Sequence, residues 1–346
     1  MTKAAMPVPL GIIGAGQIAR FHAEAISATS GHLVAIADPN ESAGRSLAGR
    51  FQAAWHADPH ALLADPRIQA VIVATPNATH CELALAALEA GKDVLCEKPM
   101  TTSVGDSLRL VRAVREHPDV VFQVGYMKRF NPGFRLLNET LPRIGEPLAA
   151  AFRVLAERRG GPVQGWYQEP RHSGGGILTH SGSHLLDVLR YLLGEPVRVD
   201  ARVTYAPDVP GLDWATQALI DMVSGVTVSF AAIATPAPGL GHTGEGWEET
   251  IEVIGDKGRV RLSSPNWQAT APCLLTLQLA GEREARTLFP ERGSPWEAEM
   301  RAFLHAVQTR QSPSPDVVDG YRVDAVLAAL YTSGQQRTPV DIPPCP

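Results

Sequence analysis

A glycine-rich stretch near the start of the chain contains the residue types that bind a phosphate group. The stretch is GIIGAGQIA at residues 11–19, and it lies between a short apolar run and a segment with helical spacing. Gly14 allows a tight turn, and Gly16 lets the backbone approach a pyrophosphate without an intervening side chain. We expect Gly14, Gly16, Gln17 and Ile18 to bind the pyrophosphate at the positive end of the helix.

Asp38 ends the next apolar run, about 20 residues further along, where dinucleotide-binding domains carry an acidic residue. Its carboxylate suits the two hydroxyls of an adenosine ribose and would repel a 2′-phosphate. The sequence therefore predicts NAD as the cofactor, with NADP less favoured, although Arg45 is a candidate phosphate partner. The alternative is a glycine turn without a ligand, in which Asp38 is only a turn residue before Pro39.

The elements that must position these residues alternate between apolar strands and helices up to about residue 125. The predicted strands are residues 9–13, 32–37, 70–74, 93–96 and 120–124, and the predicted helices are residues 21–27, 81–90 and 103–116. Near-continuous apolar strands separated by helices indicate a parallel sheet that is covered on both faces. We therefore predict a doubly wound Rossmann domain over residues 1–125.

The pattern changes after Gly125 to long alternating segments with few helices. The predicted β segments are residues 148–155, 197–205, 216–232, 249–262 and 274–279, and the predicted helices are residues 180–193, 296–309 and 320–333. This pattern predicts an α+β domain with a large, mainly antiparallel open sheet over residues 126–346. The fold class is thus α/β with two domains, as expected for 346 residues.

The composition argues against several classes of protein. The net charge is −5 and no long basic run is present, so nucleic-acid binding is not predicted. No stretch approaches the roughly 20 apolar residues that a membrane span needs, and the first residues lack the features of a signal peptide, so a cytoplasmic location is expected. The four cysteines are scattered without C-x-x-C spacing, which predicts neither a zinc site nor a disulfide framework.

Three further motifs follow the glycine turn in order. They are TPN at residues 75–77, EKP at residues 97–99, and GGG at residues 174–176 before a predicted helix with HSGSH at residues 180–184. Together with the glycine turn, they resemble the glucose–fructose oxidoreductase/inositol dehydrogenase/rhizopine-catabolism (Gfo/Idh/MocA) family over essentially the whole chain. The resemblance implies a nicotinamide-dependent oxidoreductase.

Both the resemblance and the geometry of an open parallel sheet bring the cofactor residues together. Ligands of such sheets bind outside the carboxyl ends of the strands, near the point where the strand order reverses. We expect Thr75, Pro76, Asn77 and His80 to line the cofactor groove. Glu97 is expected to accept hydrogen bonds from the ribose on the nicotinamide side.

Lys98 is the first candidate acid/base residue, and it is also expected to contact the cofactor. Beside the positive nicotinamide ring the charged form of a buried lysine is disfavoured, which lowers its pKa toward neutrality. Lys98 can then accept or relay the proton of a substrate hydroxyl while hydride leaves the carbon. The alternative is a surface lysine at a strand end.

His184 is the second candidate, because it matches the last residue of the family's G-G-G-x-L-x-D-x-G-x-H pattern, which the resemblance implies is a general acid/base. His180 stands where the family usually has aspartate, and we expect both imidazoles to point from one helix face into the same cleft. An imidazole cannot supply the negative charge of a carboxylate, so the division of labour stays open. Asp187 is predicted to be a structural partner. The two histidines also have zinc-ligand spacing, but the glutamate of H-E-x-x-H is absent and no metal is predicted.

The candidate substrate residues depend on weaker patterns. Tyr126 and Arg129 lie at the predicted crossing between the domains, and Trp166 and Tyr167 lie in a predicted loop before the triple glycine. Clefts between domains bind ligands, and aromatic rings stack on sugar faces, so all four are candidates for substrate contact. A purely structural role is an open alternative for each of them.

The predicted reaction is hydride transfer between the nicotinamide and a secondary alcohol or ketone of a sugar, cyclitol or related polyol. One alternative keeps the fold but changes the substrate to a dihydrodiol or a tetrapyrrole. A second alternative is a regulatory protein that binds the dinucleotide without catalysis. The poorly alternating segment 226–233 predicts an apolar sheet face, through which a homodimer or homotetramer would form.

Overall fold

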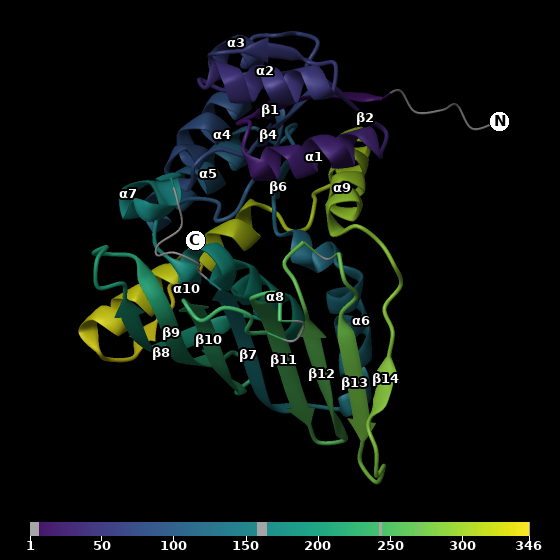
Figure 1. Cartoon of the computed structure of the whole chain (residues 1–346), viewed down its shortest axis with the longest axis vertical. Coiled ribbons are helices and arrows are strands. Elements are labelled where there is room, and N and C mark those ends of the chain that lie inside the picture. The colour runs from purple at the N-terminus through teal and green to yellow at the C-terminus, as the bar shows by residue number, and fades with distance from the viewer. Residues whose placement is uncertain (1–6, 158–164, 242–243, 269, 346) are drawn as a thin grey trace, which may run out of the picture. The chain divides into compact units, whose positions relative to one another are not determined.

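The computed structural model describes residues 7–157, 165–241, 244–268 and 270–345, and it contains two compact units (Figure 1). The first unit comprises Met1–Met127 and Trp296–Tyr321, and the second comprises Lys128–Pro295 and Arg322–Pro346. The prediction assigned everything after residue 125 to one domain. The structure differs from it, because Trp296–Tyr321 belongs to the first unit.

The first unit is built on a six-stranded parallel sheet in the order β3-β2-β1-β4-β5-β6. Its strands are β1 (Val8–Ile13), β2 (Gly31–Ala37), β3 (Ala54–His56), β4 (Ala70–Val73), β5 (Asp93–Cys96) and β6 (Phe122–Val124). Every residue of β4, β5 and β6 is buried, as expected for strands that are covered on both faces. The predicted Rossmann sheet is confirmed, with the order reversing between β1 and β4.

Helices cover this sheet. They are α1 (Gln17–Ser27), α2 (Glu41–Arg50), α3 (Pro59–Leu63), α4 (His80–Glu89), α5 (Val104–Glu116) and α9 (Pro295–Thr309). The sequence analysis had not predicted α2, β3 or α3. Two glycines weaken the helical pattern of α2, which begins where the Asn40 side chain accepts a hydrogen bond from the Ala43 N–H at 3.1 Å. Helix α9 joins this unit because Trp296 stacks on Phe21 with ring centroids 5.1 Å apart.

The second unit is built on a nine-stranded sheet in the order β14-β13-β12-β11-β7-β10-β9-β8-β15. Its strands are β7 (Pro147–Glu157), β8 (Pro196–Tyr205), β9 (Asp213–Met222), β10 (Thr227–Thr235), β11 (Trp247–Gly255), β12 (Gly258–Ser264), β13 (Leu274–Leu279), β14 (Arg286–Leu288) and β15 (Val340–Asp341). Among the described strand pairs of this second sheet only β7–β10 is parallel, so the mainly antiparallel open sheet is confirmed. The predicted segment 216–232 is two strands, β9 and β10, because the chain turns at Gly225 with φ 86°.

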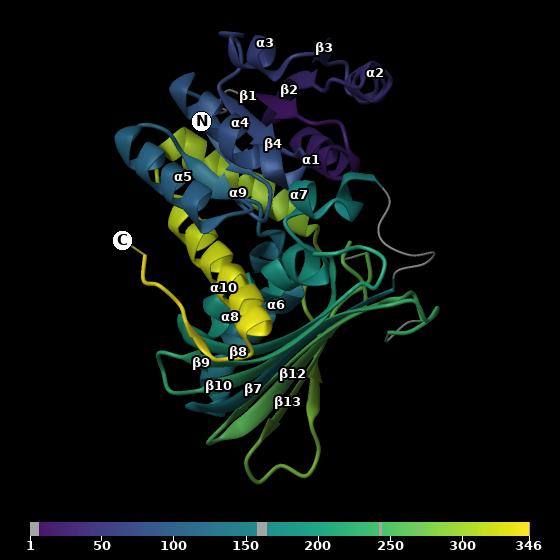
Figure 2. The same cartoon turned by 90° about the vertical axis from the view of Figure 1, so that its left-hand side faces the viewer.

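Helices of the second unit lie along one face of this sheet (Figure 2). They are α6 (Pro132–Thr140), α8 (Ser183–Leu193) and most of α10 (Val317–Gln336), while the short α7 (Pro170–Ser173) precedes the triple glycine. Beneath them, β10 buries Val228, Phe230 and Ala232 and turns Thr227 and Ser229 outward. The outward side of segment 226–233 therefore includes polar side chains, whereas the sequence predicted an apolar face.

Among the helices that the structure describes, none combines the length and the apolar character that crossing a membrane requires.

Candidate active site

The glycine turn follows β1 and lies against the end of β4, where the strand order reverses. Gly14 has φ 105°, and a Cβ atom placed on it would lie 2.3 Å from the carbonyl oxygen of Ala74. Only glycine combines this conformation with so close an approach of two strand ends. Gly16 is different, because no atom of another described residue lies within 4 Å of the Cβ position there. The turn is thus closed toward the sheet and open on its outer side.

Asp38 is tied to the same turn from the end of β2. Its Oδ2 accepts a hydrogen bond from the Ala15 N–H at 2.7 Å, and its Oδ1 accepts one from the Asn40 N–H at 2.8 Å. These bonds fix the carboxylate and leave each oxygen a further lone pair. The sequence analysis had placed Asp38 at this position but had not predicted that it also braces the glycine turn.

Arg45, the candidate phosphate partner, already has neighbours in this structure. Its Nε donates to Glu41 Oε1 at 2.8 Å, and its guanidinium carbon lies 4.3 Å from the centroid of the Trp55 ring. The indole N–H of Trp55 donates in turn to the carbonyl oxygen of Asp38 at 3.2 Å. Because the Arg45–Glu41 ion pair is exposed and therefore weak, the Trp55 ring is the firmer of the two supports.

His80 connects the two motifs that follow β4 and β5. Its Nδ1 lies 2.9 Å from the carbonyl oxygen of Pro99, and its Nε2 lies 2.9 Å from that of Thr75. Burial lowers the pKa of this imidazole, which favours the neutral ring. A neutral ring carries one N–H, so it donates to one of the two carbonyl oxygens and only packs against the other. His80 was predicted to line the cofactor groove, and the structure places it between the loops that follow β4 and β5. Asn77 is buried in the short 3₁₀ turn η1 (Asn77–Thr79) that begins after Pro76.

Glu97 ends β5 and is held by a residue that the sequence analysis did not single out. His22, fully buried on α1, lies with its Nε2 2.8 Å from Glu97 Oε1, while Glu97 Oε2 accepts a hydrogen bond from the Lys98 N–H at 3.1 Å. Burial alone would raise the pKa of Glu97, but His22 and Lys98 hold it below its usual value. Glu97 is therefore an ionised carboxylate beside Lys98, which is half-buried and precedes a cis peptide bond to Pro99.

A signal for His22 does exist in the sequence, although it is a faint one. His22 lies on the apolar side of α1, between the buried residues Ala19 and Ala25, where a polar side chain needs a partner. The edge of its ring also faces Trp296, with centroids 5.3 Å apart. Neither partner is near His22 in the sequence, so the pattern of α1 alone does not identify them.

These residues fit a dinucleotide. Within the described part of the chain, no side chain caps the N-terminus of α1, so the first N–H groups beyond Gly16 are available to phosphate oxygens. Gln17 is exposed there and Ile18 is half-buried. Asp38 contacts the residue before this helix start and Glu97 contacts His22 within the helix, and carboxylate oxygens at two such places suit the hydroxyls of two riboses.

In the second unit, His180 and His184 lie on consecutive helical segments of different geometry. His180 belongs to a π-helical turn, η5 (Leu178–Gly182), and His184 belongs to the first turn of α8. The prediction assumed one regular α-helix, in which residues four apart share a face. The π turn changes that relation, and such turns are frequent at functional sites. His180 is buried and His184 is half-buried.

The two predicted aromatic residues pack on each other and on His180. The rings of Trp166 and Tyr167 stack with centroids 3.8 Å apart, and the Tyr167 ring meets the His180 ring at an angle of 64° and 4.5 Å. Trp166 is also half-buried. The rings of Trp166, Tyr167 and His180 thus form one aromatic cluster, and His180 is its member that replaces the family's aspartate.

Arg129 and Tyr126 were predicted to contact substrate, and the structure shows where each lies. The Arg129 guanidinium donates two hydrogen bonds to the buried Asp187 carboxylate, from Nη2 to Oδ1 at 2.6 Å and from Nε to Oδ2 at 2.9 Å. This bidentate pair attaches the start of the second unit to α8, so Asp187 is the structural partner that was expected. Tyr126 is fully buried in the first unit.

One cluster of the described residues has the spacing of a metal site. Atoms of Cys81, Glu82 and Asp106 lie within 4.8 Å of one another. Arg109 already forms ion pairs with both carboxylates, with Nη1 2.6 Å from Glu82 and 2.9 Å from Asp106. Burial also raises the pKa of the Cys81 thiol to about 12, which disfavours the thiolate that binds metals.

Comparison with known proteins places this geometry in context. Residues 8–126 match the model of an oxidoreductase family with an NAD-binding Rossmann fold, and residues 142–261 match the model of the Gfo/Idh/MocA C-terminal domain. Inositol 2-dehydrogenase 2 of Saccharopolyspora erythraea is 30% identical over 99% of this chain and 98% of its own. Inositol 2-dehydrogenase of Agrobacterium fabrum is 28% identical over 99% of both chains.

Solved structures agree with these relatives. The structure of levoglucosan dehydrogenase in complex with NADH is 25% identical to this chain, covers 98% of it and 100% of its own length, and superimposes with a TM-score of 0.87. The same enzyme in complex with NADH and levoglucosan has a TM-score of 0.87 over 97% of this chain.

Proposed function

Because the chain belongs to the Gfo/Idh/MocA family of oxidoreductases, we propose that it oxidises a secondary alcohol of a sugar, cyclitol or related polyol, or reduces the corresponding ketone. Its cofactor is NAD, as the sequence predicted. The observation that carries the proposal is the convergence of the open glycine turn, Asp38 and the Glu97–Lys98 pair at the carboxyl ends of β1, β2 and β5. In an open parallel sheet that edge is where nucleotides and their substrates bind.

When bound at the glycine turn, Asp38 and Glu97, NAD would supply the acceptor for the hydride of the substrate carbon. The residues of this chain manage the proton. Lys98 takes the proton of the substrate hydroxyl, directly or by relay, as the C–O bond becomes a carbonyl. Glu97 stays ionised beside it and offers oxygens to a ribose hydroxyl.

His184 is the second proton-handling group of the proposal. It is half-buried at the start of α8, so its imidazole is accessible to a substrate and is also protected from bulk water. His180 carries no negative charge, and its imidazole suits a hydrogen bond to a substrate hydroxyl. Its ring packs against that of Tyr167, and aromatic rings at this place favour substrates with an apolar face. We assign Trp166, as a member of the same aromatic cluster, to substrate contact.

A substrate panel tests this proposal. The relatives point to myo-inositol and levoglucosan as the first two compounds, followed by glucose and other polyols. NAD reduction is monitored by absorbance, and turnover with at least one polyol is expected. Turnover only with a dihydrodiol or a tetrapyrrole would replace the substrate class. NAD binding by calorimetry without any turnover would favour the regulatory alternative.

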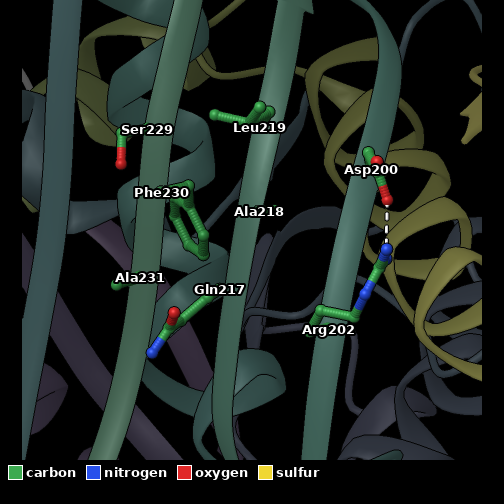
Figure 3. A pocket seen from close by; sticks show the side chains of 8 residues that line it. All are labelled: Asp200, Arg202, Gln217, Ala218, Leu219, Ser229, Phe230 and Ala231. Atoms are coloured by element: carbon green, nitrogen blue, oxygen red, sulfur yellow. Dashed lines mark hydrogen bonds and ion pairs between the residues drawn. The ribbon is translucent and has the colours of Figure 1, made fainter. Parts of the chain in front are cut away.

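We further propose that the chain forms a homodimer or homotetramer through the open face of the nine-stranded sheet. No described element covers that face, and the outward side chains of β8, β9 and β10 surround a shallow hollow there (Figure 3). Leu219 is 55% exposed in this hollow, between the Asp200–Arg202 pair and Ser229. Light scattering of the wild type should give a dimer or tetramer, and Leu219→Arg should shift it toward the monomer; a monomeric wild type would refute the assembly.

A further inference from the structure

The triple glycine and the helix after it are held by a carboxylate that lies far away in the sequence. Asp213, the first residue of β9, accepts a hydrogen bond from the Gly176 N–H at 2.5 Å through Oδ1 and one from the Leu178 N–H at 2.8 Å through Oδ2. The residue that precedes the π turn, Ile177, makes no side-chain cap. Asp213 therefore caps this helical segment from another strand, and its negative charge lies where the helix dipole favours it.

A tyrosine from α10 completes the arrangement. The Tyr331 hydroxyl donates to Asp213 Oδ1 at 2.5 Å and lies 2.8 Å from Thr179 Oγ1. Thr179 directly precedes His180 in the π turn, so this hydroxyl contacts both the cap and the segment that is capped. Asp213 is 1% exposed, and these bonds are therefore shielded from water.

The glycines are a consequence of this close packing. A Cβ atom on Gly176 would lie 2.0 Å from the carbonyl oxygen of Asp213, and one on Gly175 would lie 2.1 Å from the Tyr331 hydroxyl. Gly175 also has φ 145°. The triple glycine at residues 174–176, one of the motifs that carry the family resemblance, thus allows Asp213 and Tyr331 to approach the backbone closely.

The proton positions follow from the contacts. Burial and the neighbouring Asp213 raise the pKa of Tyr331 well above its usual value, so the hydroxyl keeps its proton and donates. Burial also raises the pKa of Asp213, while the Tyr331 hydroxyl and the Leu178 and Gly176 N–H groups counteract that rise. Tyr205 is the other titratable neighbour of Asp213, and burial raises its pKa as well.

We propose that Asp213 and Tyr331 are positioning residues that fix the orientation of the His180–His184 segment and thereby support catalysis. Both residues act through the backbone and Thr179. The inference rests on the proposed function, because it assigns the benefit of this order to His184. A displacement of about 1 Å at a reacting group can reduce turnover by up to about 100-fold.

The test uses the full chain with Tyr331→Phe, which removes one hydroxyl and keeps the ring, and Asp213→Asn, which keeps the shape and removes the charge. Tyr191→Phe is the matched control, because it also removes a tyrosine hydroxyl from this unit. That hydroxyl is partly buried and accepts a hydrogen bond from the Asn138 side chain at 3.1 Å. Hydrogen-exchange mass spectrometry follows the peptide that covers residues 174–184. Steady-state kinetics follow kcat, the KM for NAD and the pH–rate profile.

We expect exchange of the 174–184 peptide to become about tenfold faster in Tyr331→Phe, with kcat lower by about 10- to 100-fold and the KM for NAD unchanged. Tyr191→Phe should leave the exchange of this peptide and kcat as in the wild type. If Asp213→Asn does not fold, Tyr331→Phe still decides the question.

Unchanged exchange of this peptide in Tyr331→Phe would overturn the positioning role. Faster exchange with wild-type kcat and an unshifted pH profile would overturn its link to catalysis. The proposed function fails separately, if His184→Ala turns over as fast as the wild type, whatever the exchange data show.

Discussion

Each of the two units of this protein buries a carboxylate that bonds a motif with a proposed catalytic residue, and the two carboxylates have charged and neutral partners respectively. Glu97 is paired with the His22 imidazole and the Lys98 backbone, and these partners hold its pKa down although burial alone would raise it. Asp213 meets neutral donors only, and burial raises its pKa. A positively charged or protonatable partner favours the ionised form of a buried carboxylate. Neutral hydrogen-bond donors offset only part of the rise in pKa that burial causes.

This difference matches what each carboxylate does. In the proposed function Glu97 offers its carboxylate oxygens to a ribose hydroxyl, and a negative charge there favours that hydrogen bond. Asp213 accepts its hydrogen bonds from groups inside the protein, namely the N–H groups of Gly176 and Leu178 and the hydroxyl of Tyr331. In the proposed function the carboxylate of the first unit therefore serves a ligand at a strand end, whereas the carboxylate of the second unit holds the helical turn that carries His180.

The largest expected effect tests whether each unit supplies one proton-handling group. Lys98→Met and His184→Ala should each lower kcat by at least about 100-fold, the usual scale for a positioned acid or base. NAD binding should survive in His184→Ala, because His184 lies in the unit without the glycine turn. Steady-state kinetics and calorimetry provide the measurements.

The exposed residues Lys257 and His305 supply matched controls, and Lys257→Met and His305→Ala should behave as the wild type. Full turnover in Lys98→Met at every pH tried would remove the proposed mechanism and leave only a cofactor-binding fold.

Much of the first unit could be predicted because its signals are local. The glycine turn, Asp38 and the EKP motif each follow an apolar strand, and one strand plus one helix are enough to locate them. The capped helix α2 was missed because its glycines hide the helical period. His22 was missed because its partners, Glu97 and Trp296, come from distant segments.

The second unit was harder to predict, because its site is assembled from long-range contacts. The sequence indicated His180, His184 and the mainly antiparallel sheet, but it contained no signal for the π turn or for its hydrogen bonds with Asp213 and Tyr331. Helix α9 was predicted as a helix, yet nothing in its sequence indicates that it packs on α1. Period and composition describe an element; its partners depend on the tertiary fold.

The next effect concerns the charge that selects the cofactor. Asp38→Ala should weaken NAD binding by about 10- to 100-fold, because it removes charge-assisted hydrogen bonds to a ribose. It should also narrow the difference between NAD and NADP, since the repulsion of a 2′-phosphate disappears. Calorimetric titration with both cofactors measures the ratio. An unchanged preference for NAD would show that the selectivity lies outside Asp38, with Arg45 and Trp55 as the next residues to vary.

A smaller effect tests the His22–Glu97 pair. His22→Phe should lower the free energy of unfolding at neutral pH by about 1–3 kcal/mol, because it leaves a buried carboxylate oxygen without its donor. In the wild type the pKa of Glu97 is lowered from 4.5, so its contribution to stability is present above that value and is lost as the pH falls through the lower, folded value. The deficit of the variant should therefore shrink on acidification.

Denaturant titrations at neutral and acidic pH measure that deficit. His22→Gln serves as the control, because its amide can still donate to Glu97 and should restore part of the stability. A deficit that is the same at every pH would mean that His22 contributes packing against Trp296 and no charge stabilisation.

The smallest expected effect concerns His180, which separates this chain from the family's usual pattern. His180→Asp places a carboxylate four residues before His184, and a nearby negative charge raises the pKa of an imidazole. If His180 merely replaces the carboxylate as an orienting group, the variant should keep turnover within about tenfold of the wild type, less than the loss of an acid or base would cause. Its pH optimum should then move upward.

His180→Ala distinguishes the two roles of His180. A modest loss of turnover fits an orienting group, and a loss as large as that of His184→Ala means that His180 shares the proton transfer. Because His180 also packs edge-on against Tyr167, the Tyr167→Leu variant is the control for lost aromatic packing. A downward shift of the pH optimum in His180→Asp would contradict the electrostatic argument, since an added carboxylate cannot lower the pKa of His184.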